Sequence, residues 1–255
     1  MFELTRGYLG REPLRVAVAG VGGSGSEIVS GLVNLHHALE AFGYGGLEVW
    51  AFDPDTVAVA NIVRQHYTMA DLGRPKAETL IHRVNMACGF GWHGIHDPFA
   101  GEVARESWDL VISAVDTRSA RHALHKAAFS AGFRAWKFWL DVGNTATTGQ
   151  AILGTPRNAK RALAYALPCA TQLHPELMDL SLPDDDRPSC SAIEALSKQD
   201  LFVNKRVALA GLDLLWELFH AKRLRHHGVY FDLRRRIESP LRVPEKPKRT
   251  VRAAR

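Results

Sequence analysis

Short apolar runs alternate with stretches of helical spacing along the first 155 residues of the chain. Six of these runs predict strands, over residues 16–19, 47–52, 91–96, 110–114, 136–142 and 149–154. Helical spacing between them predicts helices over residues 26–42, 75–88 and 119–132. Such alternation is typical of βαβ units, whose parallel strands are covered by helices on both faces. The sequence therefore predicts an α/β fold with a Rossmann-like, doubly wound, mainly parallel sheet.

The pattern changes after residue 155. Five prolines and the acidic run at 184–186 mark a long irregular connection, and helical spacing returns over 191–219. From Ala221 to Arg255 the chain has 12 lysines and arginines against 3 acidic residues, and few apolar ones. Such a segment buries too little surface to offset its ordering entropy, which predicts a mobile end. It could contact nucleic acid or an acidic partner, but a solvated terminus is the simpler interpretation.

These boundaries divide the chain into four parts. We expect an ATP-binding core over 1–155, a crossover segment over 156–190, a C-terminal helical part of the same domain over 191–235, and a basic mobile tail over 236–255.

Composition excludes several classes of protein. The chain is 46% hydrophobic and 23% charged, which is ordinary for a soluble globular protein. The three cysteines, Cys88, Cys169 and Cys190, form no C-x-x-C pair, so we expect no structural zinc and a reducing compartment. The first residues lack the order of a signal peptide, and no apolar run approaches the length of a membrane span. We therefore expect a cytoplasmic protein with no membrane partner.

A glycine-rich turn follows the first predicted strand and opens the first predicted helix. Its backbone N–H groups and the helix dipole favour an anion such as a phosphate. The candidate contacts are Gly20, Gly22, Gly23, Ser24 and Gly25. Asp53 ends the second long apolar run, where an acidic residue can accept hydrogen bonds from ribose hydroxyls, and Asp55 lies close behind it.

Further polar residues follow at positions suited to a triphosphate. Arg64 and Lys76 supply two cations, and Asp116 leaves a predicted strand end as a natural Mg²⁺ ligand. Asn61 and Gln65 can hydrogen-bond a phosphate or the sugar. Another interpretation makes the two cations solvated surface residues and Asp116 a helix N-cap.

Taken together, these motifs resemble those of the E1-like adenylyltransferases, the superfamily of ThiF, MoeB and the ubiquitin-activating enzymes. The shared pattern is G-x-G-G-x-G, D-x-D-x-V, N-x-x-R-Q, a lysine, and an aspartate after a later strand, and it covers roughly residues 15–150. The resemblance implies that the chain uses ATP and Mg²⁺ to adenylate the C-terminal carboxylate of a ubiquitin-like protein. It also implies that the crossover segment passes over the nucleotide site.

A narrower resemblance involves residues 140–144 and 188–202, which are similar to the ThiF-like proteins of PRTRC systems on bacterial mobile elements. It implies a β-grasp protein substrate and a JAB-type peptidase encoded nearby. Many E1-like proteins are homodimers, so we expect one here. In many such dimers, an N-terminal segment with an R-x-x-R-Q-like pattern places an arginine in the partner's site. This chain has Arg6, Arg11 and Arg15 in that region, but not the pattern.

Cys190 is the candidate nucleophile for a thioester step after adenylation. It lies between a proline-rich loop and a predicted helix whose N-terminal N–H groups would lower the thiol pKa, although the acidic run at 184–186 would raise it. Cys169 is a second candidate, and Cys88 is expected in the core.

The histidines predict no metal site. His122 and His125 share a helix face without a third ligand, and His36 and His37 are adjacent and expected to point apart.

Two other functions compete with adenylation. An NAD-dependent oxidoreductase would need only the glycine turn and Asp53, but it would have no use for Arg64 and Lys76. A non-catalytic module of a mobile element could bind protein or DNA through the basic tail, although the intact Arg64, Lys76 and Asp116 favour retained chemistry.

Overall fold

The computed structural model describes residues 1–129, 136–156, 166–182, 184 and 199–245. An eight-stranded sheet runs through the molecule in the order β10-β9-β7-β6-β5-β2-β3-β4. Its strands are β2 (Leu14–Ala19), β3 (Leu47–Phe52), β4 (His93–Ile95), β5 (Leu110–Ser113), β6 (Phe138–Asn144), β7 (Thr148–Gly154), β9 (His226–Asp232) and β10 (Ile237–Arg242). The strands from β4 to β6 in this order are parallel, whereas β7, β9 and β10 add antiparallel neighbours. A doubly wound, mainly parallel α/β fold is therefore confirmed.

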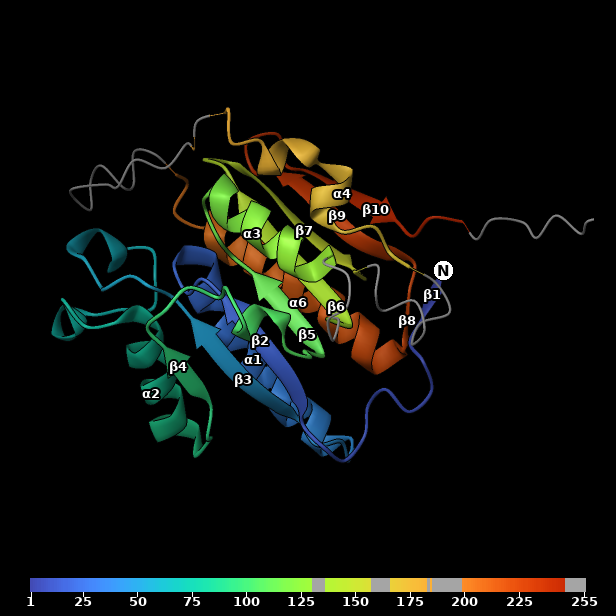
Figure 1. Cartoon of the computed structure of the whole chain (residues 1–255), viewed down its shortest axis with the longest axis horizontal. Coiled ribbons are helices and arrows are strands. Elements are labelled where there is room, and N and C mark those ends of the chain that lie inside the picture. Colours follow the sequence, from blue (N-terminus) through green and yellow to red (C-terminus); the bar gives the residue numbers. More distant parts are fainter. Residues whose placement is uncertain (130–135, 157–165, 183, 185–198, 246–255) are drawn as a thin grey trace, which may run out of the picture.

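Helices cover both faces of this sheet (Figure 1). One face carries α1 (Gly23–Ala41), α2 (Lys76–Cys88) and α6 (Val203–Ala221); the other carries α3 (Arg118–Phe129) and the short α4 (Ala170–Leu173). In the described connections lie the 3₁₀ turns η1 (Val59–Asn61), η2 (Met69–Asp71), η3 (Val103–Arg105) and η5 (Pro175–Met178). A second, two-stranded sheet pairs β1 (Phe2–Glu3) with β8 (Arg223–Leu224).

The pair of long helices, α1 and α6, packs closely because small residues lie at the contact. A Cβ atom on Gly31 of α1 would lie 2.1 Å from Cδ1 of Leu212 on α6. On the sheet side of α6, a Cβ atom on Gly211 would lie 3.1 Å from Leu140 of β6. This contact brings the first turn of α6 beside the start of α1.

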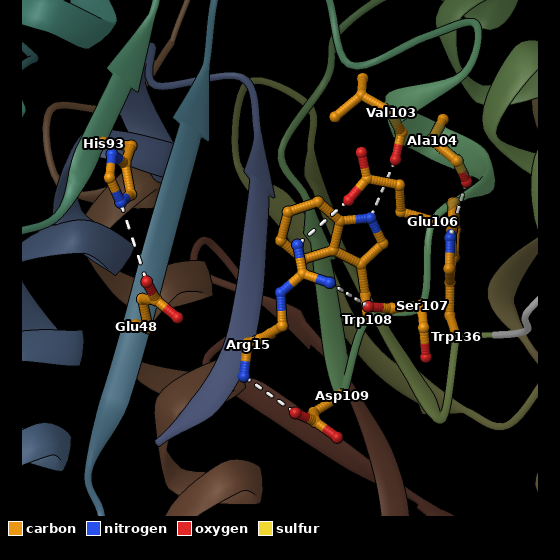
Figure 2. Close-up of polar contacts among 10 residues, drawn as sticks. All are labelled: Arg15, Glu48, His93, Val103, Ala104, Glu106, Ser107, Trp108, Asp109 and Trp136. Atoms are coloured by element: carbon orange, nitrogen blue, oxygen red, sulfur yellow. Dashed lines mark hydrogen bonds and ion pairs between the residues drawn. The ribbon is translucent and has the colours of Figure 1, made fainter. Parts of the chain in front are cut away.

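Aromatic side chains fill the opposite layer and fix the amino ends of the strands (Figure 2). The indole N–H groups of Trp108 and Trp136 each donate to a carbonyl of η3 at 2.9 Å. Arg15 of β2 lies 4.6 Å from the Trp108 ring centroid, and its backbone N–H donates to Asp109 at 2.8 Å. These contacts are at the end of the sheet away from the glycine turn, so they position the strands without taking part in the site.

The structure corrects the interpretation of the basic end of the chain. Residues 226–242 form β9 and β10, where we expected a helical part up to 235 and a mobile tail from 236. Within β9, Val229 and Phe231 are buried against the core, and His227 lies beside β7 with its Nδ1 2.9 Å from the Leu153 carbonyl. The arginines at 234–236 form the turn between the two strands, so their charge is compatible with a paired hairpin. Residues 246–255 lie outside the described part.

Most of the other predicted elements are present with small shifts at their ends, but the helical spacing predicted from 191 gives a helix only from Val203, and residues 191–198 lie outside the described part. All six predicted strands form, β3 with the predicted bounds, and helix α6 begins at Val203. Among the described residues, no helix has the length and apolar character needed to cross a membrane.

Candidate functional site

The glycine turn joins β2 to α1 at the carboxyl edge of the parallel strands. Gly20 has a positive φ of 86°, and a Cβ atom there would lie 2.8 Å from the Ala114 carbonyl oxygen. A Cβ atom on Gly25 would lie 1.9 Å from the Gly20 carbonyl oxygen. The helix N-cap is Gly22, which contributes no side-chain cap to the first turn. The first N–H groups of α1 can therefore receive an anion.

Buried side chains from other elements hold this turn in place. Asp53, which is 5% exposed, accepts the Val21 N–H at 2.8 Å on Oδ2 and the Asp55 N–H at 2.9 Å on Oδ1. Burial raises its pKa, although Lys76 and the two amide hydrogen bonds act in the opposite direction. Tyr67 donates its hydroxyl to the Val21 carbonyl at 2.9 Å. Asp53 thus links the turn to the end of β3, and each of its oxygens keeps a second acceptor site beyond the backbone N–H that it already binds.

Lys76 begins α2 and lies against Asp55. The lysine side chain is only 8% exposed, and its Nζ is 2.7 Å from Oδ2 of Asp55, whose side chain is 65% exposed. The backbone N–H of Lys76 also donates to the Asp55 carbonyl at 3.0 Å. A buried ammonium needs such a partner, since removing a charge from water is costly. The interpretation of Lys76 as a solvated surface residue is therefore wrong.

The loop after β3 places the other predicted polar residues. Asn61 accepts the Ala58 N–H at 2.8 Å on Oδ1, which leaves its Nδ2 group as the atom able to meet a ligand. Arg64 donates to Gln199, just before α6. Gln65 lies beside the turn, since a Cβ atom added to Gly22 would be 3.9 Å from its Nε2. The Oε1 of Gln65 is buried and has no hydrogen-bond partner among the described residues.

A pocket of about 260 Å³ opens beside this loop. Its polar lining comes from Arg64, Gln65, His66 and Glu27, and from Lys205 on α6. His66 Nε2 lies 2.9 Å from Glu27, which is also 3.5 Å from Lys205 Nζ. The pocket therefore brings cationic groups to the start of α1.

Asp116 lies just after β5, on the other side of the glycine turn. Its side chain is exposed, and it has no hydrogen bond or ion pair with another described residue. The cap of α3 is Thr117, whose Oγ1 accepts the Ala120 N–H at 3.2 Å. The helix-cap interpretation of Asp116 is therefore wrong, and its carboxylate is placed where a cation could bind it.

Sequence reasoning missed three residues beside the turn, of which Asn144 and Asn204 come from distant parts of the chain. The hydroxyl of Ser24 donates to Oδ1 of Asn144 at 3.1 Å and approaches Oδ1 of Asn204 at 3.3 Å. The Nδ2 of Asn204 would lie 2.4 Å from a Cβ atom on Gly23. Tyr67 is the third, since its hydroxyl also reaches the Lys76 carbonyl at 3.3 Å. No local pattern marks Asn144 or Asn204, although Tyr67 could be suspected from its place two residues after Gln65.

The described cysteines are poorly suited to nucleophilic chemistry. Cys169 is fully buried, and burial followed by the charge of Asp141 raises its thiol pKa. Cys88 lies at the end of α2, away from the glycine turn. Cys190, the predicted nucleophile, lies outside the described residues.

The histidines differ from expectation at one position. His36 and His37 converge on Glu40, with ring nitrogens 3.2 Å and 3.6 Å from its Oε2, where we expected them to point apart. These atoms lie within 4.8 Å of one another, close enough to hold a metal ion. However, the Leu47 N–H donates to Nδ1 of His36 at 2.9 Å, which leaves Nε2 as the protonated nitrogen that donates to Glu40. The contact between His36 and Glu40 is therefore explained as a hydrogen bond, without a metal ion.

The arrangement as a whole can hold a nucleotide triphosphate with a divalent cation. The glycine turn offers N–H groups, Arg64 and Lys76 offer positive charge on one side, and Asp116 offers an exposed carboxylate on the other. The buried Oε1 of Gln65, which has no hydrogen-bond partner among the described residues, and the open space beside Gly22 fit a ligand at this place.

Comparisons with known proteins agree with this fold. The model of the ThiF family matches residues 8–197. No curated protein matches the sequence significantly. Among solved structures, E. coli MccB with ATP superposes with a TM-score of 0.58 at 12% identity, covering 94% of this chain and 67% of that one.

Two further structures give the same result. PaaA has a TM-score of 0.56 at 14% identity, covering 92% of this chain and 65% of its own. E. coli MccB with AMPCPP and MccA has a TM-score of 0.59 at 13% identity, covering 92% and 65%. The chain thus spans about two thirds of the length of these proteins, and at such identities the likeness shows the fold.

The close backbone approach at the turn generates a test. Gly25→Ala should destabilise the fold by about 1 to 3 kcal/mol, because the added Cβ atom collides with backbone that cannot move aside, and it should abolish ATP binding. Gly91→Ala is the control, since a Cβ atom there meets nothing within 4 Å. Urea denaturation and ATP titration of both variants check this, and equal stability of the two would contradict the geometry.

Proposed function

This chain belongs to the ThiF family, and we propose that it is an adenylyltransferase that uses ATP to activate a polypeptide carboxylate. The observation that carries the proposal is the buried lysine. Lys76 is 6% exposed at the edge of the sheet that also presents the glycine turn, and Arg64 lies on the loop leading to it. A fold would not keep a buried ammonium beside a phosphate-binding turn for stability alone, because the desolvation cost offsets most of the gain.

The proposed reaction joins the substrate to AMP. An oxygen of the ionised substrate carboxylate attacks the α-phosphorus of ATP, the bond from that phosphorus to the bridging oxygen breaks, and the electron pair leaves with pyrophosphate. The product is an acyl adenylate. No general base is needed, because the attacking carboxylate is already deprotonated near neutral pH.

Each residue has a role that its position supports. The N–H groups at Gly22 to Ser24 bind phosphate, and Asp55 and Asn61 face the sugar. Arg64 and Lys76 stabilise the negative charge that develops on the leaving pyrophosphate. Asp116 would hold Mg²⁺, which supplies further positive charge to the phosphate oxygens when bound.

For the substrate, we propose a ubiquitin-like, β-grasp protein whose C-terminus enters the site, in a system of the PRTRC type with a JAB-type peptidase. Three observations support a polypeptide substrate. The family match is to ThiF, and a structural neighbour, MccB, has been solved together with MccA. The pocket beside Arg64 offers cationic and polar groups to an incoming chain end.

We favour adenylation over an NAD-dependent oxidoreductase, because the pyrophosphate of a dinucleotide would have no use for Arg64 and for the buried Lys76 beside the turn. The alternative function, a non-catalytic module that binds through a basic tail, loses part of its support, because β9 and β10 within residues 226–242 are strands of the main sheet.

Exchange of pyrophosphate into ATP tests the two cations. Arg64→Ala and Lys76→Ala should each lose about 2 to 4 kcal/mol of transition-state stabilisation, because each removes a preorganised charge donor. Arg74→Ala is the matched control, since Arg74 is an exposed cation on the same loop. The assay uses the purified chain with candidate ubiquitin-like proteins, and full activity in either site variant would remove that residue from the mechanism.

Asp116→Asn separates metal binding from helix capping. The amide lacks the charge that Mg²⁺ requires, so exchange should be lost while binding of the nucleotide without metal is kept. The melting temperature should stay unchanged, whereas Thr117→Ala should lower it through loss of the cap, by about 1 kcal/mol of unfolding free energy. A fall in melting temperature for Asp116→Asn equal to that of Thr117→Ala would argue against the metal role.

Cys190→Ala tests whether a thioester follows adenylation. The variant should keep pyrophosphate exchange but lose any conjugate that a reducing agent cleaves, because the thiol acts only after the adenylate forms. Cys169→Ala is the control, since its buried thiol should not contribute to the conjugate. If the wild-type chain exchanges pyrophosphate without forming a conjugate, the reaction ends at the acyl adenylate.

A further inference from the structure

The two long helices, α1 and α6, run in the same direction. A Cβ atom on Gly23 of α1 would lie 2.4 Å from Nδ2 of Asn204 on α6, and one on Gly31 would lie 2.1 Å from Cδ1 of Leu212. From the first contact to the second the chain advances by eight residues on each helix, which shows that the pair is parallel. Both N-termini therefore lie at the end that carries the glycine turn, and the positive ends of two helix dipoles meet beside it.

The side chain of Asn204, in the first turn of α6, is enclosed at this place. Asn204 is only 6% exposed, and a side chain on Gly23 would displace its amide group. The segment before α6 is itself fixed to the sheet. The Asp200 N–H donates to the Ala146 carbonyl at 2.8 Å, and Oδ1 of Asp200 accepts the Phe202 N–H at 3.1 Å. The amide of Asn204 is therefore held against the first turn of α1 by packing on both sides.

The donor atom of this amide is left without an acceptor. Oδ1 of Asn204 accepts from the Ser24 hydroxyl at 3.3 Å, but Nδ2 has no hydrogen-bond partner among the described residues. It lies beside the start of α1, where Gly22 supplies no side-chain cap and the first N–H groups are donors too. A buried amide normally has an acceptor for its donor atoms. Several donors that converge with no acceptor between them require a ligand with several acceptor oxygens, which is an anion such as a phosphate.

From this geometry we propose that Asn204 is a further phosphate-binding residue. Its Nδ2 group donates a hydrogen bond to the phosphate on the first turn of α1, next to the N–H groups at Gly22 to Ser24. The inference rests on the nucleotide binding proposed above and extends it, because every nucleotide contact and metal ligand predicted from the sequence lies within the first 116 residues. A bound phosphate would thus join the last long helix to the nucleotide-binding half of the chain.

Calorimetric titration of the full chain with ATP and with adenosine, both without metal, tests this role. Asn204→Ala should weaken ATP binding at least about tenfold and adenosine binding less than about twofold, because only ATP presents a phosphate to the amide. Asn144→Ala is the matched comparison, since it removes the other amide that Ser24 binds but no donor that faces Gly23. It should change the ratio of the two affinities less than about twofold. Equal weakening of ATP and adenosine by Asn204→Ala would overturn the proposal.

Asn204→Asp keeps the size of the side chain and replaces the donor with a negative charge. Two helix N-termini favour that charge, so the melting temperature without ligand should be kept or raised. The affinity for ATP should nevertheless fall further than in Asn204→Ala, because the carboxylate repels the phosphate. An affinity for ATP equal to that of the wild-type chain would overturn the proposal.

The melting temperature of Asn204→Ala separates phosphate binding from helix capping. With the amide turned over, Oδ1 would face Gly23 and cap α1, and Nδ2 would donate to Ser24. Loss of such a cap would lower the melting temperature of the variant without ligand and leave the ratio of ATP to adenosine affinity unchanged. This pair of results would overturn the proposal, whereas a changed ratio supports it.

Inorganic tripolyphosphate, which lacks the nucleoside, distinguishes this inference from the proposed function. If the wild-type chain binds tripolyphosphate but not ATP, and Asn204→Ala loses that binding, the phosphate site stands and adenylation does not. If the wild-type chain and Asn204→Ala bind both ligands equally well, the role of Asn204 is overturned and nucleotide binding stands. A wild-type chain that binds neither ligand would overturn both.

Discussion

The close approach of two backbone segments at the glycine turn is the constraint on which the site depends. Gly25 lies directly against the Gly20 carbonyl, and Gly20 lies against the end of β5, with no room for a side chain at either position. Because the turn is this tight, the start of α1, the end of β2 and the end of β5 all lie within reach of one ligand. The neighbours of the turn are fixed in the same way: Asp53 and Tyr67 bind the two sides of Val21, and Asn204 packs on Gly23.

Around the glycine turn, buried and exposed carboxylates have different roles. Asp53 is buried, and its oxygens are used to bind the backbone, so burial raises its pKa even with Lys76 nearby. Asp55 and Asp116 lie on the surface of the same edge and present their carboxylates outward. The fold thus uses one buried acidic residue to hold the turn and leaves two exposed ones at the same edge of the sheet. Recognition of a triphosphate requires a preorganised backbone. Its reaction requires charged groups that can rearrange together with the metal ion.

Much of this could be predicted from the sequence, since the decisive signals are local. The run 47–52 predicted β3 with its bounds, and the motif residues met at one edge because parallel strands end on the same side. What could not be predicted depends on distant contacts. Asn144 and Asn204 reach the turn only because β6 and α6 pack behind it, and β9 was hidden by the arginines of the turn that follows. The convergence of His36 and His37 has a local cause, since Glu40 lies one helical turn away and pairs with both rings. A motif shows where the Asp53 carboxylate lies, but the hydrogen bonds that it accepts from Val21 and Asp55 were visible only in the structure.

The order of the strands also determines when the molecule can be completed during synthesis. Strand β7 pairs with β6 soon after both have been made, but its other edge is covered by β9, which follows α6 much later in the chain. Until residues 226–232 have left the ribosome, β7 presents an unpaired edge of peptide groups and its apolar residues lack part of their cover. Pairing between segments so far apart closes slowly, because the intervening chain must be ordered first. The nascent chain therefore passes through a stage in which its nucleotide-binding half can already be folded while its sheet is still able to pair with another chain.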